Sequence, residues 1–149
     1  MRDRLIKAIA TFFFVGYLPF MPGTWGSLAG VAIYLLLRHS TFLCLAVFVL
    51  LFFLGFYAAA KGEALFGAKD DKRIVIDEVC GILLLYLLIP GETAYLAAGF
   101  ILYRVFDILK PYPIRRLENA AGSFGIMMDD VVASLYAFVA ITLFLMIRS

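Results

Sequence analysis

The chain has 149 residues, of which 64% are hydrophobic, and it carries a net charge of +2. Soluble domains are roughly 45–50% apolar, and a soluble domain of this length could not bury the excess. The composition therefore excludes an ordinary soluble domain and predicts an integral membrane protein. The length leaves room for one domain, over residues 1–149, and for no separate soluble module.

The N-terminus carries basic residues that are followed by a mostly apolar run over residues 8–18. This order is similar to that of a signal peptide, but no small-x-small cleavage site follows the run. Pro19 and the turn-forming segment 22–26 follow instead, so we expect the N-terminus to be retained.

Five apolar segments predict an all-α fold, a small polytopic bundle of about five transmembrane helices. They cover residues 27–37, 41–60, 79–89, 93–103 and 131–147. Residues 41–60 match the roughly 20 residues that cross the hydrocarbon core, whereas the three shortest segments span it only if their helices continue into polar flanks. Pro90 and Gly91 predict a tight connection between the third and fourth helices.

With five spans, the polar segments alternate between the two faces of the membrane. Every Lys and Arg except Arg38 and Arg148 then lies on one face, and the positive-inside rule makes that face cytoplasmic. The same arrangement places every acidic residue except Glu92 on the cytoplasmic face. We therefore predict a multi-pass protein with carboxylates at the cytoplasmic ends of its helices.

Residues 18–27 contain two prolines and two glycines, which disfavour a continuous helix. We expect Thr24 or Ser27 to cap the helix that follows, and the exposed N–H groups of a helix start suit a phosphate. The alternative is an interfacial turn with Trp25 at the level of the headgroups.

Asp77 and Glu78 are flanked by apolar residues on both sides, whereas residues 70–73 predict a solvated loop. Adjacent helical residues point about 100° apart. The pair could therefore serve one metal only if one ligand is indirect or the start of the helix is irregular. We expect one of the two to be a ligand and the other a base or a group that positions a ligand.

Arg104 and Asp107 are helical neighbours at i, i+3, and so are Asp107 and Lys110. Pro111 predicts the end of that helix. The charges could form a structural ion-pair ladder whose stems lie along apolar surface, or they could bind a substrate.

Asp129 and Asp130 open the last predicted span, where the helix dipole favours negative charge. A cap needs one carboxylate, so the second one suggests a further role. Together the acids offer the hard oxygen ligands that Mg²⁺ takes with water and phosphate oxygens, and the Lys and Arg residues add positive charge beside them. Such a metal can polarise a phosphoryl group and supply a hydroxide.

Other phosphatase nucleophiles are disfavoured by the sequence. His39, the single histidine, lies on the far face, and the sixth residue after Cys80 is Tyr86 rather than the Arg of a Cys-based phosphate loop. No Asp-x-Asp pair occurs. The phosphoryl acceptor is therefore water or a single carboxylate.

These four segments, in this order, resemble the phosphatidylglycerophosphatase A family over nearly the whole chain. The matching stretches are residues 22–27, 76–78 with Gly81, Phe106 and Asp107 with Lys110, Pro111 and Pro113, and Gly125 through Asp129 and Asp130. The resemblance implies a Mg²⁺-dependent phosphatase that acts on phosphatidylglycerol phosphate at the cytoplasmic side of a bacterial inner membrane. It implies a phospholipid and a membrane as partners and no nucleic acid, and it leaves the oligomeric state open.

The resemblance also suggests roles for individual residues. The candidate catalytic residues are Asp77, Glu78, Asp107 and Asp130, the candidate metal ligands are Asp77, Asp129 and Asp130, and the candidate substrate-binding residues are Gly23, Thr24, Gly26, Arg104 and Lys110. Within these sets we hypothesise that Asp77 and Asp130 bind the metal and that Glu78 is the base that orients water.

Two other classes of protein stay open. A CDP-alcohol phosphatidyltransferase also carries acids at cytoplasmic helix ends, but its Asp-Gly-x2-Ala-Arg start is absent here. A small cation transporter would need acids near the middle of the bilayer, and residues 41–60 and 131–147 contain none.

Overall fold

The computed structural model describes residues 1–69, 71–118 and 122–148. Its helices are α1 (Arg2–Ala10), the short 3₁₀ turn η1 (Val15–Tyr17), α2 (Pro22–Leu37), α3 (Thr41–Phe66), α4 (Ile76–Leu88), α5 (Thr93–Leu109), α6 (Ile114–Glu118) and α7 (Ser123–Arg148). The ranges described contain no strand. The prediction of an all-α fold is therefore confirmed.

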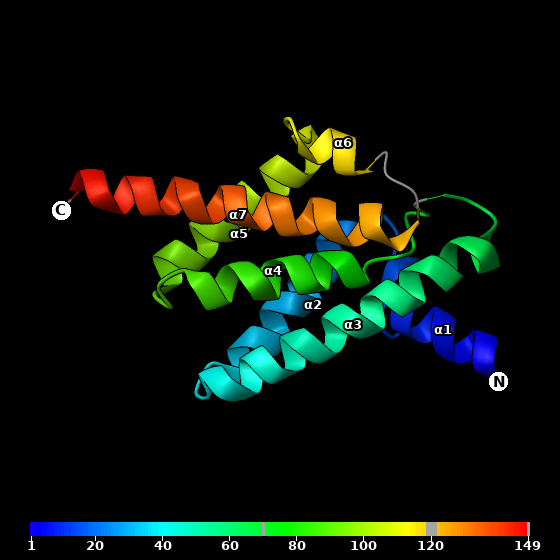
Figure 1. Ribbon diagram of the computed structural model, residues 1–149. Coiled ribbons are helices and arrows are strands. Elements are labelled where there is room, and N and C mark those ends of the chain that lie inside the picture. The colour runs from blue at the N-terminus through cyan, green and yellow to red at the C-terminus, as the bar shows by residue number, and fades with distance from the viewer. Residues whose placement is uncertain (70, 119–121, 149) are drawn as a thin grey trace.

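Helix α4 forms the centre of the bundle. It packs against α2, α3 and α7 and lies between α3 and α7 in Figure 1. Val79, Ile82, Leu83 and Leu85 are fully buried on it, as expected for a helix that is apolar all round. Its 13 residues measure about 20 Å. The helix is enclosed by its neighbours, so it does not have to present a membrane-length surface of its own.

Helices α3 and α7 are long and apolar enough to cross a membrane, by length and composition. Each has 26 residues, which correspond to about 39 Å. Helix α2 is apolar but shorter. Two of the five predicted spans thus reach membrane length, and the other three correspond to shorter helices.

The connections between helices gather at two ends of the bundle (Figure 1). The N-terminus and the connection between α3 and α4 lie at one end, whereas residues 38–40, residues 89–92 and the C-terminus lie at the other. The connections therefore alternate between the two ends of the bundle, and their placement on two faces of a membrane stays a prediction.

Helix α2 begins at Pro22, earlier than the predicted residue 27. Pro22 occupies the first turn, where a missing N–H is tolerated, and Met21 precedes it in the left-handed conformation with φ 55°. The capping prediction is wrong, because no side chain caps the helix and the Ser27 hydroxyl donates to the Gly23 carbonyl inside it.

Close packing explains why α2 has a glycine, Gly30, in its interior. A Cβ at Gly30 would lie 2.1 Å from Ile82 Cγ2 and 2.8 Å from the Val79 carbonyl oxygen. Helix α2 can therefore lie directly on α4. The packing gained there outweighs the helix propensity that glycine lacks, about 1 kcal/mol relative to alanine.

Helix α7 begins at Ser123, so Asp129 and Asp130 lie about two turns inside it. The prediction that these acids open the helix is wrong. Helix α5 ends at Leu109 with Lys110 in the left-handed conformation, φ 45°, so the predicted helix end before Pro111 is confirmed.

The connection before α4 is held by an ion pair within it and by a hydrogen bond to the last residue of α1. The Arg73 guanidinium donates to both carboxylate oxygens of Asp71 at 2.7 and 2.8 Å, and these bonds lower the pKa of Asp71 below its usual value. The Val75 N–H donates to the Ala10 carbonyl at 2.9 Å. Within the predicted loop 70–73, Asp70 lies outside the described residues. The remainder forms no helix, with Lys72 exposed and with Asp71 and Arg73 half-buried.

Candidate active site

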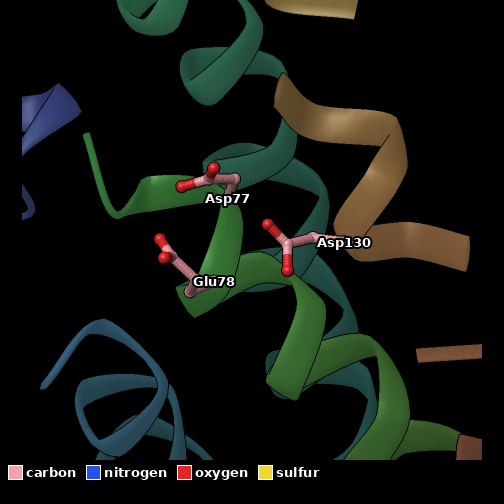
Figure 2. Close-up of side chains that lie close together, drawn as sticks. All are labelled: Asp77, Glu78 and Asp130. Atoms are coloured by element: carbon pink, nitrogen blue, oxygen red, sulfur yellow. The ribbon is translucent and has the colours of Figure 1, made fainter. Parts of the chain in front are cut away.

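Three carboxylates from two helices share one small space. Asp77 and Glu78 belong to the first turn of α4 and Asp130 belongs to α7, and each offers an oxygen within 4.8 Å of the others. Figure 2 shows the three side chains gathered at the start of α4. Asp77 and Asp130 are only 6% and 3% exposed. The angle between adjacent helical residues therefore does not prevent Asp77 and Glu78 from contributing to one site.

Hydrogen bonds fix α7 against α4 at this level. The Ser134 hydroxyl lies 2.7 Å from the Gly81 carbonyl and 2.8 Å from the Asp130 carbonyl. The Tyr103 hydroxyl donates to Asp130 Oδ1, and its ring occupies the space that a Cβ at Gly81 would need. Helices α4, α5 and α7 thus place the Asp130 carboxylate beside those of α4.

Two cations lie beside the carboxylates, each with an acidic partner. Arg104 Nη1 donates to Asp107 Oδ2 at 2.5 Å and to Ser27 Oγ at 3.4 Å. Lys110 Nζ lies 2.9 Å from Asp129 Oδ2. The predicted pairing of Arg104 with Asp107 is confirmed, and Lys110 contacts an acid of another helix.

The carboxylates and cations line a pocket of about 560 Å³. Of the sequence candidates, Gly23, Asp77, Glu78, Arg104, Asp107, Lys110, Asp129 and Asp130 line it. Thr24 and Gly26 do not. The group of three carboxylates contains Glu78 in place of Asp129, which is a candidate metal ligand. Asp129 instead forms the ion pair with Lys110. The roles of all these residues stay predictions.

Gly23 and Gly26 make two close approaches possible. A Cβ at Gly23 would lie 2.1 Å from Glu78 Oε1, and one at Gly26 would lie 2.8 Å from Val75 Cβ. Gly23 therefore leaves the space that the Glu78 carboxylate occupies. Gly26 allows α2 to contact the residue that precedes α4.

Sequence reasoning missed three polar residues at the site. Lys72 lines the pocket, although it belongs to the segment predicted as a solvated loop. Tyr103 and Ser134 hold Asp130 through hydrogen bonds from α5 and within α7. Both lie inside apolar runs without a local motif, so their sequence positions carry no signal of this contact.

The site has buried polar atoms without a hydrogen-bond partner among the described residues. They are Asp77 Oδ1, Glu78 Oε2 and Arg104 Nε. Burial disfavours the charged form of a carboxylate, and neighbouring carboxylates add to that cost. A hard divalent cation would take such oxygens as ligands. The donor set of Asp77, Glu78 and Asp130 therefore fits a metal such as Mg²⁺.

These features define an all-helical protein with membrane-length helices and an acidic, cation-lined pocket at one end of its bundle. The comparisons with known proteins give the family. The sequence profile of phosphatidylglycerophosphatase A matches residues 8–145, and the chain belongs to that family.

Three relatives are similar over most of their length. A Bacteroides thetaiotaomicron protein that carries the provisional name phosphatidylinositol-3-phosphatase is 41% identical over 89% of this chain and 89% of its own. The phosphatidylglycerophosphatase A of Haemophilus influenzae is 40% identical over 91% and 86%, and that of Escherichia coli is 35% identical over 84% and 74%. No solved structure matches the chain.

Proposed function

We propose that this protein is a membrane lipid phosphatase that converts phosphatidylglycerol phosphate to phosphatidylglycerol. The observation that carries the proposal is the pocket in which three carboxylates, two of them buried, lie beside Arg104, in a chain of the phosphatidylglycerophosphatase A family. Family membership favours this function over those of a phosphatidyltransferase or a cation transporter.

The protein is proposed to cross a bacterial inner membrane about five times, with the pocket on the cytoplasmic side. The outer faces of α3 and α7 support this placement, because Phe42, Phe53, Phe144 and Ile147 are all exposed. Soluble proteins rarely expose such continuous apolar surface. The basic residues at the pocket end of the bundle support the orientation.

We propose Asp77 and Asp130 as the residues that hold Mg²⁺, with Glu78 beside them as the base that orients water. The metal, when bound, would neutralise charge on the phosphoryl oxygens and lower the pKa of a bound water. In this arrangement Asp129 has a different task, because its ion pair with Lys110 keeps that cation at the pocket.

The residues of the chain supply the rest of the chemistry. Phosphoryl transfer is promoted by positioning and by neutralising charge on the equatorial oxygens. Arg104 is held by Asp107 through Nη1, which leaves its buried Nε without a partner among the described residues and able to donate to a phosphate oxygen. Glu78 Oε2 is similarly unpartnered and can accept a proton from the attacking water. Water adds across the P–O bond, and inorganic phosphate and the lipid alcohol are released.

The proposal is tested by phosphate release from phosphatidylglycerol phosphate in detergent micelles, with Mg²⁺ and then with EDTA. We expect release with Mg²⁺ and none after chelation. Release that persists in EDTA would contradict the proposed metal, and no release from folded protein in either condition would contradict the proposed function. CMP-dependent conversion of the lipid would indicate a phosphatidyltransferase.

A parallel assay with phosphatidylinositol 3-phosphate addresses the name of the Bacteroides relative, which is as similar to this chain as the phosphatidylglycerophosphatases are. We expect the higher kcat/KM with phosphatidylglycerol phosphate. A higher value with the inositol lipid would assign the same pocket to a different headgroup.

A further inference from the structure

We infer that the groove between α2 and α5 binds an acyl chain of the lipid substrate, an inference that rests on the proposed function. The groove has a volume of about 370 Å³. Its walls are mostly apolar, with Leu28 and Leu35 on α2 and with Leu96, Ala97 and Phe100 on α5. No residue of this groove has been assigned a role in the pocket described above.

The groove lies next to the polar pocket, and one polar contact stands between them. Ser27 on α2 accepts a hydrogen bond from Arg104 on α5, at 3.4 Å between Nη1 and Oγ. Leu28 follows Ser27 directly, and Phe100 lies one helical turn before Arg104, so the groove begins where this polar contact ends. A lipid whose phosphate meets Arg104 would therefore have its glycerol and first methylenes at the mouth of the groove.

The groove is open along its outer side. Helix α2 packs mainly on α4, and α5 packs mainly on α7, so the two walls diverge around α4. Leu28, Leu35 and Ile101 are exposed along the opening. On the floor, the Tyr86 hydroxyl donates to the Leu96 carbonyl at 2.8 Å. The floor thus presents no unsatisfied hydroxyl, and a chain could enter sideways from the bilayer.

The length of the groove fits one acyl chain. From Leu28 to Arg38, ten residues of helix rise about 15 Å. One leaflet contributes about half of the roughly 30 Å hydrocarbon core. The groove is therefore about as long as a single lipid chain.

A second groove, between α5 and α7, is larger at about 660 Å³ but is separated from the pocket. The rings of Phe106 and Tyr136 meet with their centroids 5.5 Å apart. They lie one turn closer to the pocket than Leu102 and Ala140, which line that groove. Two aromatic rings therefore stand between this groove and the carboxylates, whereas a single polar contact stands between the other groove and the pocket, and the groove between α2 and α5 is the better candidate.

Two neighbouring alanines give a matched test. Ala97 lines the groove between α2 and α5 and Ala98 lines the groove between α5 and α7, and both are exposed on the same helix. We would compare Ala97→Trp and Ala98→Trp with the unmodified chain on dipalmitoyl and dihexanoyl phosphatidylglycerol phosphate. Leu35→Trp fills the same groove from α2 and serves as a second variant if Ala97→Trp does not fold.

We expect Ala97→Trp to lower the ratio of kcat/KM for the long-chain lipid to that for the short-chain lipid by about tenfold, because about two buried methylenes lose their contact. Ala98→Trp should leave the ratio unchanged. An unchanged ratio in Ala97→Trp and Leu35→Trp, or a selective loss in Ala98→Trp, would overturn the inference. Absence of phosphate release from both lipids by the unmodified chain would instead overturn the proposed function itself.

Discussion

Burial and mutual repulsion act on Asp77, Glu78 and Asp130, because each carboxylate lies beside two others and the side chains of Asp77 and Asp130 are almost fully withdrawn from water. Without a cation, the repulsion and desolvation of these groups oppose folding. Residues that are unfavourable for stability and yet gathered in a pocket are expected where function requires them.

Asp77→Asn is expected to separate activity from stability. The amide removes one negative charge from the buried group and keeps nearly the same shape. Phosphate release should fall at least about a hundredfold, as for the loss of a group that stabilises the transition state. The unfolding temperature in detergent, measured without metal, should stay the same or rise.

Asp3→Asn is the matched control, since Asp3 is exposed on α1, and it should leave both quantities unchanged. Near-normal turnover in Asp77→Asn would remove Asp77 from the proposed mechanism. A large fall in its unfolding temperature would show that the carboxylate is structural.

The ion pair between Lys110 and Asp129 gives a second prediction at this scale. Asp129 is almost fully buried, and Lys110→Met would leave its charge without this partner. We expect a loss of about 1–3 kcal/mol in the free energy of unfolding. The double variant with Asp129→Asn should recover most of that stability, which a double-mutant cycle of thermal denaturation measures. A single variant as stable as the parent chain would show that the pair contributes little.

At the scale of elements, the contact between α2 and α4 sets the geometry of the pocket. Helix α2 carries Gly23 and Ser27, and α4 carries Asp77 and Glu78. The two helices can approach closely because Gly26 and Gly30 have no side chain to separate them. A change that pushes these helices apart should therefore affect the pocket from a distance.

Gly30→Val is expected to lower both stability and activity. Its methyl groups would overlap Ile82, and such overpacking costs about 1–3 kcal/mol. Ala32→Val, on the exposed face of the same helix, provides the comparison and should change the unfolding temperature little. Equal unfolding temperatures for the two variants would contradict the close packing of α2 on α4.

At the scale of the whole molecule, the two ends of the bundle should face opposite sides of the membrane. Lys69 follows α3 and Glu92 precedes α5, and the connections that contain them lie at opposite ends of the bundle (Figure 1). With Cys44 and Cys80 replaced by Ala, we expect a membrane-impermeant maleimide to label Glu92→Cys from outside intact bacterial cells. Lys69→Cys should react only after the membrane is permeabilised.

Labelling of both positions from the outside would contradict a membrane-crossing bundle. The reverse pattern would place the pocket outside the cytoplasm. Helix α4 is short and enclosed by other helices. The labelling pattern therefore also tests whether α4 carries the chain from one side of the membrane to the other.

Local signals were sufficient to predict the five apolar helices and several of their ends, but not the short helices α1 and α6. Apolar composition defines the segments. Pro90, Gly91 and Pro111 interrupt them through local backbone effects that do not depend on the surrounding structure. The gathering of charge at one end follows from the alternation of segments. These features depend on neighbouring residues in the chain, which is why the amino-acid sequence predicts them.

The membership of the carboxylate group required the three-dimensional packing. Glu78 lies with Asp77 and Asp130, whereas Asp129 lies against Lys110. The difference between the adjacent acids of α7 depends on the rotation of that helix against α4, which the Ser134 contacts help to fix. The space that Gly23 leaves for Glu78 likewise involves residues far apart in the chain. Contacts of this kind carry no local sequence signal, because they arise only when separate helices meet.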